Sequence, residues 1–253
     1  MKFGLIGYPI AHSLSPTLFK AGYDGKFPYD LIETPDFEEA YQIFLDGYDG
    51  INVTAPFKEL ALKKADIVSR ECELTGATNL LVKTPDGVAA YNSDYRGLVM
   101  LLESMHRPED DTPARTLIVG LGGAGKAAAA AARTLGHEVI LMNRTQYSPE
   151  VLPLERFREE FRKAGMIIYN LPVAIPQLQE LTDEDFTPGL AKTLLEANYR
   201  NPSFGKELTD MALKANPEFR LVKGEAWLLS QAVTGYELFT GEKPDLSRMS
   251  AQI

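Results

Sequence analysis

Short apolar runs alternate with helix-patterned segments along the first part of the chain. Strand-length apolar runs occupy residues 2–7, 29–34 and 49–54, whereas residues 16–22 and 37–44 space their apolar positions as an amphipathic helix does. The resulting order of strand, helix, strand, helix and strand is typical of a parallel sheet. Ligands of such sheets collect beyond the carboxyl ends of the strands, so residues that directly follow a strand are candidates for function.

A helix and a hairpin are expected next. The pattern predicts a helix over 58–69, and then two strands, 80–82 and 88–91, on either side of a Thr-Pro-Asp-Gly turn. Adjacent antiparallel strands bring the start of one close to the end of the other. We therefore expect Asn79, which opens the first strand, to lie near residues 92–94, which follow the second.

The segment 115–145 has the order strand, glycine turn, helix and strand. An apolar strand is expected over 116–119, an alanine-rich helix over 127–135, and a second strand over 138–142. This order is that of a βαβ unit, in which the turn between the first strand and the helix faces the ligand.

Three glycines of this turn, Gly120, Gly122 and Gly125, match the pattern G-x-G-x-x-G. The pattern permits a tight turn, a close approach of the backbone to a pyrophosphate, and close packing of the helix on the strand. The start of the helix adds unpaired N–H groups that favour phosphate. The alternative is a glycine-rich turn without a ligand, but the strand before the motif and the helix after it favour dinucleotide binding.

The residues after the second strand of this unit distinguish NADP from NAD. An NAD site usually has an Asp or Glu here for the ribose 2′-hydroxyl, and an NADP site has a nearby Arg. Asn143, Arg144 and Thr145 stand at this point, without an acid. Arg144 can hold a 2′-phosphate through paired, charge-assisted hydrogen bonds, so we expect NADP. The alternative is a solvated arginine.

The remaining chain continues the alternation of strands and helices. Strands are expected over 166–169, 193–198 and 220–222, and helices over 206–215 and 226–239. The periodicity of the last helix leaves open whether its polar residue Gln231 faces a site or solvent.

Composition narrows the class of protein. At 253 residues, with a net charge of −9, the chain can hold one large or two small domains and lacks the general basic surface of a nucleic-acid-binding protein. The single cysteine, Cys72, excludes an internal disulfide and fits a reducing compartment. Three histidines, His12, His106 and His137, are too dispersed for a metal site. Without an apolar leader or a membrane-length apolar run, we expect a cytoplasmic protein that binds neither membrane nor nucleic acid.

A nicotinamide site beside a second α/β domain implies hydride transfer. The reduction of a ketone also needs a proton donor, and the histidines are poorly placed for that role. Lys58 lies just beyond the strand 49–54, and Asp94 leaves the strand 88–91, so a lysine oriented by a carboxylate is the candidate acid and base. The alternatives are a solvated Lys58 and an Asp94 that only caps the following helix.

Two serines, Ser13 and Ser15, stand in a turn beyond the first strand. Each hydroxyl can donate and accept a hydrogen bond, which suits a carboxylate or a polyol. A capping role ahead of Pro16 explains Ser15 equally well, but it leaves Ser13 unexplained.

The sequence resembles the shikimate dehydrogenase family along nearly its whole length and in the order of the family's motifs. The matching segments are Ser13-Leu14-Ser15-Pro16, Asn52-Val53-Thr54-Ala55-Pro56-Phe57-Lys58, Gly76-Ala77-Thr78-Asn79, Asn92-Ser93-Asp94, Gly120–Gly125, Asn143-Arg144-Thr145 and Gln231-Ala232. The resemblance implies a reversible NADP-linked reduction of 3-dehydroshikimate to shikimate, within chorismate and aromatic amino-acid biosynthesis.

The resemblance also implies roles for single residues. Lys58 and Asp94 would form the catalytic pair. The substrate-binding residues would be Ser13, Ser15, Thr54, Asn79, Tyr199 and Gln231. The cofactor-binding residues would be Gly120, Gly122, Gly123, Ala124, Gly125, Asn143, Arg144, Thr145 and Gly224. The chain departs from the family pattern at Tyr95, where a glycine is usual, at Asn170-Leu171-Pro172, and at Glu225-Ala226, where a Leu-Gly-type pair is usual.

The implied architecture is α/β, with a substrate-binding catalytic domain over 1–102 and a Rossmann-type NADP-binding domain over 103–223. The C-terminal helices within 224–253 would return to the first domain. The polar segment 106–113 is expected to be a surface connection. We expect small-molecule partners, and a monomer or a homodimer. The alternatives are a quinate/shikimate dehydrogenase that uses NAD, and a non-catalytic homologue that binds shikimate.

Overall fold

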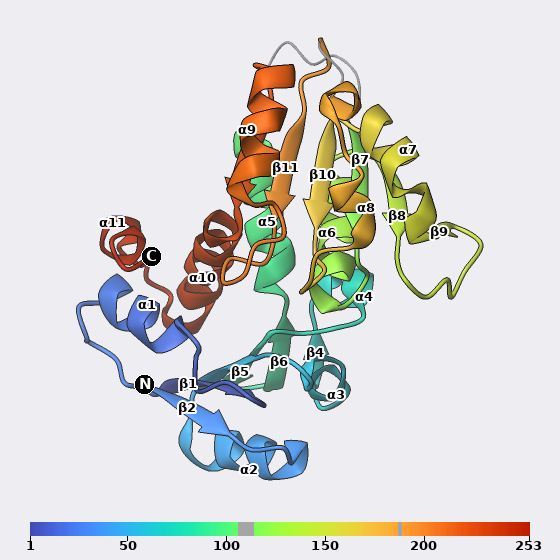
Figure 1. The fold of residues 1–253 in the computed structure, drawn as a ribbon. Coiled ribbons are helices and arrows are strands. Elements are labelled where there is room, and N and C mark those ends of the chain that lie inside the picture. Colours follow the sequence, from blue (N-terminus) through green and yellow to red (C-terminus); the bar gives the residue numbers. More distant parts are fainter. Residues whose placement is uncertain (106–113, 187–188) are drawn as a thin grey trace. The chain divides into compact units, whose positions relative to one another are not determined.

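The computed structural model describes residues 1–105, 114–186 and 189–253, and the chain forms two compact units (Figure 1). The first unit contains Met1–Leu98 and Leu228–Ile253, and the second contains Val99–Trp227. The expected connection at 106–113 lies outside the described residues. The domain boundaries expected after residues 102 and 223 stay predictions. Among the described residues, no helix is both long and apolar enough to cross a bilayer.

The first unit contains a mixed sheet with the strand order β2-β1-β3-β5-β6-β4. Its strands are β1 (Phe3–Gly7), β2 (Tyr29–Glu33), β3 (Gly50–Val53), β4 (Ile67–Val68), β5 (Leu80–Thr84) and β6 (Gly87–Tyr91). Its helices are α1 (Ser15–Gly22), α2 (Phe37–Gly47), α3 (Lys58–Lys63), α4 (Arg70–Thr75), α11 (Leu246–Ser250), and the parts of α5 (Ser93–Met105) and α10 (Gly224–Thr240) that belong to this unit. The strands β2, β1 and β3 are parallel as predicted, and β5 joins them antiparallel.

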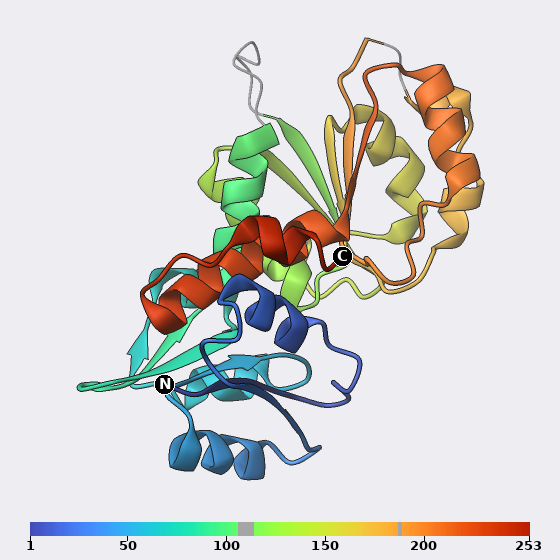
Figure 2. The same cartoon turned by 90° about the vertical axis from the view of Figure 1, so that its left-hand side faces the viewer.

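Helices cover both faces of this sheet (Figures 1 and 2), and each face has its own apolar core. On one face, α2 packs its buried Phe44 near Ile51 of β3. On the other face, Phe3 of β1 stacks on Phe239 of α10, with ring centroids 4.9 Å apart. This stack confirms that the C-terminal helix returns to the N-terminal sheet. Burial of these side chains on both faces is the main stabilising contribution to the unit.

The helix predicted over 58–69 is wrong in its second half. Helix α3 ends at Lys63, and Ile67–Val68 forms the short strand β4, which pairs in parallel with Ala89 and Ala90 of β6. The chain then begins the separate helix α4. Two β-branched residues beside an open sheet edge favour the strand, because the edge offers backbone partners that the helical pattern cannot reveal.

The second unit contains a wholly parallel sheet with the order β12-β11-β10-β7-β8-β9. Its strands are β7 (Arg115–Val119), β8 (Glu138–Met142), β9 (Val151–Leu152), β10 (Met166–Tyr169), β11 (Thr193–Glu196) and β12 (Arg220–Lys223). Its helices are α6 (Gly123–Thr134), α7 (Phe157–Lys163), α8 (Pro176–Gln179) and α9 (Lys206–Ala215), with 3₁₀ turns at Leu154–Arg156 and Asp183–Phe186. This is the predicted Rossmann-type architecture.

Helices cover both faces of the second sheet (Figure 2). The side chains of α7, α8 and α9 pack with β7, β10 and β11 in one core. The alanine-rich helix α6 buries Ala127, Ala128 and Ala131 beside β7 and β8. Small side chains let α6 lie close to the sheet, so its first turn stands directly over the carboxyl end of β7.

One lysine lies inside this unit. Lys192 is fully buried, and its ammonium donates to the carbonyl oxygens of Phe161 at 2.5 Å and Ala164 at 2.7 Å. Both carbonyls belong to the end of α7, where backbone acceptors have no helical partner. Burial lowers the pKa of Lys192 to about 8. The residue therefore caps α7 from within the unit.

Candidate active site

Most of the predicted catalytic and substrate-binding residues lie beside one edge of the first sheet. Strand β3 is parallel to β1, and β5 is antiparallel to both β3 and β6. The carboxyl ends of β1, β3 and β6 and the start of β5 therefore lie along one side of the sheet, the side where the parallel strands end, which we call this edge. The chain places Ser13 and Ser15 after β1, Thr54 and Lys58 after β3, Asn79 before β5, and Asp94 after β6. The strand directions thus gather groups that are widely separated in sequence.

Lys58 and Asp94 form an ion pair at this edge. The Lys58 Nζ lies 2.5 Å from Asp94 Oδ2, and the two side chains are 21% and 17% exposed. Lys58 is the first residue of α3, and its carbonyl accepts a hydrogen bond from Thr78 N–H at 3.1 Å. The pair is therefore positioned by two helix starts, and both side chains remain partly open to solvent.

Asp94 does not cap α5, contrary to the alternative reading of the sequence. Asn92 has that position, because its Oδ1 accepts a hydrogen bond from Tyr95 N–H at 3.0 Å. The carboxylate of Asp94 instead lies against Lys58.

A buried polar chain connects the start of β5 to α10. Asn79 Nδ2 donates to Ser93 Oγ at 2.9 Å, and Ser93 N–H donates to Asn79 Oδ1 at 2.7 Å. This contact confirms the proximity that the hairpin predicted. Ser93 Oγ in turn donates to Gln231 Oε1 at 3.2 Å, so Gln231 faces this edge rather than solvent alone.

Close packing of α5 on α10 requires glycine at position 97. A Cβ at Gly97 would lie 2.4 Å from the backbone nitrogen of Gln231. No side chain fits at that distance, so glycine lets the backbones approach and brings Gln231 to the polar chain.

The two serines interact with each other, and a tyrosine contacts the backbone of Ser15. Ser13 Oγ donates to Ser15 Oγ at 3.1 Å and accepts from Ser15 N–H at 3.2 Å. Ser15 is therefore not the N-cap of α1, because Leu14 holds that position and Ser15 is already helical. Tyr236 Oη donates to the Ser15 carbonyl oxygen at 3.1 Å, and Tyr29 Oη donates to Asn52 Oδ1 at 2.7 Å. Burial raises the pKa of both phenols. Two neutral phenols therefore border the serine pair.

The glycine motif of the second unit has the geometry that a dinucleotide needs. Gly120 adopts a φ of +88°, which only glycine tolerates readily, and a Cβ at Gly125 would lie 1.9 Å from the Gly120 carbonyl oxygen. A Cβ at Gly122 would meet nothing within 4 Å, so the space before the first turn of α6 is open. That turn contains no acidic residue. The residues present therefore fit a pyrophosphate.

The helix after this motif begins earlier than predicted, at Gly123 rather than residue 127. Gly123 and Ala124 consequently belong to the first helical turn, whose N–H groups lack helical partners.

The residues after β8 lie beside the same motif. Asn143 Oδ1 accepts from Leu121 N–H at 3.3 Å, and its Nδ2 donates to the Thr145 carbonyl at 3.1 Å. Asn143 thus ties the end of β8 to the glycine turn. Arg144 and Thr145 are exposed, and within the part of the chain that the structure describes Arg144 forms no ion pair. Its guanidinium is available to an anion.

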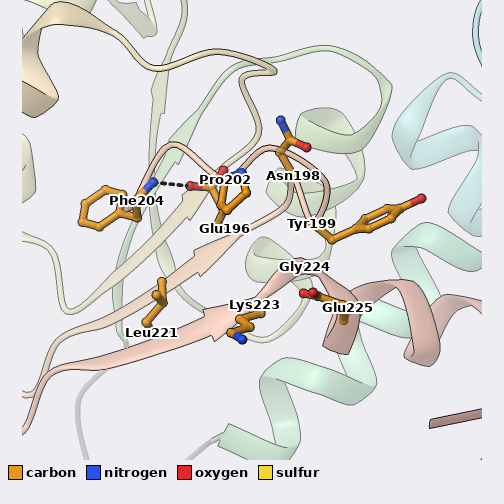
Figure 3. A pocket seen from close by; sticks show the side chains of 9 residues that line it. All are labelled: Glu196, Asn198, Tyr199, Pro202, Phe204, Leu221, Lys223, Gly224 and Glu225. Carbon is orange, nitrogen blue, oxygen red and sulfur yellow. Dashed lines mark hydrogen bonds between the residues drawn. The ribbon is translucent and has the colours of Figure 1, made fainter. Parts of the chain in front are cut away.

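A pocket of about 130 Å³ opens beyond β11 and β12 in the same unit (Figure 3). Its lining includes Tyr199 and Gly224, both singled out in the sequence, together with Glu196, Lys223 and Glu225. Glu196 is 2% exposed, and its Oε2 accepts from Ser203 and Phe204 N–H groups at 3.1 Å each. Burial raises the pKa of Glu196 to about 7.

With this geometry in hand, similarity to known proteins identifies the family. A model of the shikimate dehydrogenase substrate binding domain matches residues 5–81. A shikimate dehydrogenase (NADP(+)) of Haloarcula marismortui is 31% identical and covers 99% of this chain and 97% of its own. The chain belongs to the shikimate dehydrogenase family.

Solved structures of shikimate and quinate dehydrogenases have the same fold. The shikimate 5-dehydrogenase of Thermus thermophilus, in complex with NADP(H) and shikimate, has a TM-score of 0.81 and 27% identity over 99% of this chain and 97% of that chain. A quinate dehydrogenase of Corynebacterium glutamicum, in complex with NAD, has a TM-score of 0.80 and 22% identity over 99% and 97%. The second likeness concerns the fold alone.

Three residues beside these sites were not predicted from the sequence. Tyr29 and Tyr236 belong to apolar patterns, and nothing local indicates that Tyr29 reaches Asn52 or that Tyr236 reaches the Ser15 carbonyl. Glu196 ends an apolar run at the carboxyl edge of a parallel sheet. A carboxylate in that position is a usable signal, because ligands gather at that edge.

Proposed function

We propose that this protein is an NADP-dependent shikimate dehydrogenase, which interconverts 3-dehydroshikimate and shikimate in aromatic amino-acid biosynthesis. The observation that carries the proposal is the Lys58–Asp94 ion pair at a sheet edge lined by hydroxyl and amide groups. Membership of the family supports the substrate, since the Haloarcula and Thermus relatives are shikimate dehydrogenases.

Lys58 acts as the proton donor and acceptor. NADPH supplies the hydride that reaches the carbonyl carbon of 3-dehydroshikimate. The Lys58 ammonium delivers a proton to the carbonyl oxygen, which becomes the hydroxyl of shikimate, and the reverse reaction returns that proton to the amine. Asp94, 2.5 Å from Nζ, orients the ammonium and balances its charge.

The remaining polar groups of the edge hold the substrate. The hydroxyls of Ser13 and Ser15, 3.1 Å apart, can donate to the two oxygens of one carboxylate. Thr54, Asn79 and Gln231 offer the mixed donors and acceptors that ring hydroxyls need. Tyr199 is the remaining residue that we propose for substrate binding.

The cofactor is held by the glycine motif and the residues after β8. The first turn of α6 binds the pyrophosphate through Gly122, Gly123, Ala124 and Gly125, and Gly120 forms the turn that precedes it. Arg144 pairs with the 2′-phosphate, and Asn143 and Thr145 shape the adenosine side. Gly224 is the cofactor-binding residue that we assign to the nicotinamide half of NADP.

The proposal includes a cytoplasmic location, small-molecule partners only, and a monomer or homodimer. Cys72 is a free cysteine, which fits a reducing compartment. Burial raises the pKa of its thiol to about 11, so the thiol is unreactive. Light scattering of the purified protein measures the oligomeric state directly.

Initial rates with four substrate pairs test the function. Shikimate or quinate is oxidised with NADP⁺ or NAD⁺, and formation of the reduced nicotinamide is followed by absorbance. We expect shikimate with NADP⁺ to have the highest kcat/KM. A higher value with quinate or NAD⁺ would indicate a quinate/shikimate dehydrogenase, and shikimate binding without turnover in any pair would indicate a non-catalytic homologue.

A further inference from the structure

The pocket beyond β11 and β12 contains two hydrogen-bond acceptors without donors. Among the described residues, neither Glu196 Oε1 nor Glu225 Oε2 has a hydrogen-bond partner, although both atoms are buried. Glu196 is 2% exposed and Glu225 lines the same pocket (Figure 3). Buried polar atoms are almost always paired, so these two oxygens point to a ligand that brings N–H or O–H groups.

Close packing of the backbone brings these carboxylates to one pocket. Gly224 begins α10, and a Cβ there would lie 2.7 Å from the carbonyl oxygen of Glu196 and 2.6 Å from that of Ala197. The first turn of α10 therefore rests directly on the end of β11. This contact places Glu225 beside the strand end that presents Glu196.

The position of the pocket in the sheet indicates which part of the cofactor reaches it. The glycine motif follows β7, and the strand order changes direction there, with β8 on one side and β10, β11 and β12 on the other. Arg144, after β8, is assigned to the adenosine half, so the nicotinamide half extends to the opposite side. The strands β11 and β12 lie about 10 and 14 Å from β7 at the usual strand spacing.

The nicotinamide end of NADP carries one group with N–H donors, the amino group of its carboxamide. Resting on the cofactor assignment of the proposed function, we propose that Glu225 accepts a hydrogen bond from this amino group in the pocket that it shares with Glu196. Glu225 thereby acts as a positioning residue for the nicotinamide ring. A leucine-type residue, usual at this place in the family, cannot accept such a bond.

The state of Glu196 is compatible with this arrangement. Because burial raises the pKa of Glu196 to about 7, its carboxyl group is partly protonated near neutral pH. The protonated form donates to the carboxamide oxygen, and the ionised form accepts from the amino group. The alternative is that Glu225 only supplies a negative charge that is favourable at the start of α10.

Cofactor binding without substrate tests the proposal. Titration calorimetry measures the Kd of NADP⁺ and of its 3-acetylpyridine analogue, in which a methyl group replaces the amino group while the ring charge is unchanged. The variants are Glu225→Leu, Glu225→Gln, and the matched control Glu207→Leu, which removes an exposed carboxylate from the first turn of α9. Thermal melts establish that each variant is folded.

We expect the unaltered protein to prefer NADP⁺ over the analogue by about tenfold or more, as for a hydrogen bond to a charged acceptor. Glu225→Leu should bind the two about equally. Glu225→Gln should retain part of the preference through its amide oxygen, and Glu207→Leu should retain all of it.

Three results would overturn the inference, and only the third also bears on the proposed function. An undiminished preference in Glu225→Leu, or tight binding of both cofactors by the unaltered protein, refutes the role of Glu225 and leaves the proposed function standing. A failure of the unaltered protein to bind either cofactor removes the NADP assignment itself, and the inference with it.

Discussion

Removal of the Lys58 ammonium should slow turnover far more than it weakens substrate binding. In the Lys58→Ala variant the carbonyl oxygen loses its proton donor, a contribution of about 10² to 10⁴ in rate. This corresponds to roughly 3 to 5 kcal/mol of transition-state stabilisation. The KM for shikimate should change less, because the serine pair and the amides of Asn79 and Gln231 do not depend on the ammonium.

The geometry of the ion pair sets the effect of its partner. Asp94 lies 2.5 Å from Nζ, and both side chains are about four-fifths buried. A hydrogen bond to a charged group contributes about 1.5 to 3 kcal/mol, so Asp94→Asn should lower kcat by roughly 10- to 100-fold. Asparagine keeps the size and one acceptor oxygen, so the variant removes mainly the charge.

A double variant that combines Lys58→Ala with Asp94→Asn distinguishes a coupled pair from two independent groups. If Asp94 acts only by orienting Lys58, the kcat of the double variant should equal that of Lys58→Ala, rather than the product of the two losses. Initial rates at saturating NADP⁺ with varied shikimate give kcat and KM separately. A kcat for Lys58→Ala within a few-fold of the unaltered protein, or fully multiplicative losses in the double variant, would refute the reasoning.

Four further substitutions probe the second unit. Arg144→Ala should raise the Kd of NADP⁺ by about 10- to 100-fold and leave that of NAD⁺ nearly unchanged, because it removes a charge-assisted contact that only the 2′-phosphate makes; equal losses by calorimetry would argue against that contact. Gly125→Ala should abolish NADP⁺ binding and destabilise the fold by about 1 to 3 kcal/mol, since its Cβ would lie 1.9 Å from Gly120 O, whereas Gly122→Ala, with open space around it, should weaken binding in a fold that melts normally. Burial raises the pKa of Glu196 from 4.5 to about 7, so the folded state binds more protons than the unfolded state. The resulting contribution to the free energy of unfolding is complete below pH 4.5 and is lost as the pH rises to about 7. In the unaltered protein, the free energy of unfolding measured with urea should decline by roughly 3 kcal/mol between pH 4.5 and about pH 7 through this group. Glu196→Gln should remove most of that decline. An unchanged decline would count against burial as the cause of the raised pKa.

Local patterns in the sequence predict the second unit well. The glycine motif is flanked by a strand and a helix whose periodicities are unambiguous, and Gly120 and Gly125 occupy positions that only glycine fits. The hairpin also predicts the contact between Asn79 and residues 92–94, because antiparallel pairing relates a strand's start to its neighbour's end.

Features that depend on distant partners could not be predicted. The strand at Ile67–Val68 exists because β6 offers an edge, and the helical pattern of the flanking residues conceals it. The N-cap of α1 is Leu14 rather than Ser15, because Ser15 is already helical and its hydroxyl accepts a hydrogen bond from Ser13. Glu196 and Glu225 line one pocket because the backbone at Gly224 packs against the end of β11. No periodic pattern in the sequence indicates that contact.

Transfer of deuterium from the cofactor to the product tests the central claim most directly. The protein is incubated with 3-dehydroshikimate and NADPH that carries deuterium at the transferable position of the nicotinamide, with each face labelled in turn, and the shikimate formed is analysed by mass spectrometry. The account predicts one deuterium in shikimate, on the carbon that carried the ketone, from one of the two labelled cofactors, and almost no product from Lys58→Ala. Shikimate without deuterium from either cofactor, or no shikimate at all from the unaltered protein, would contradict it.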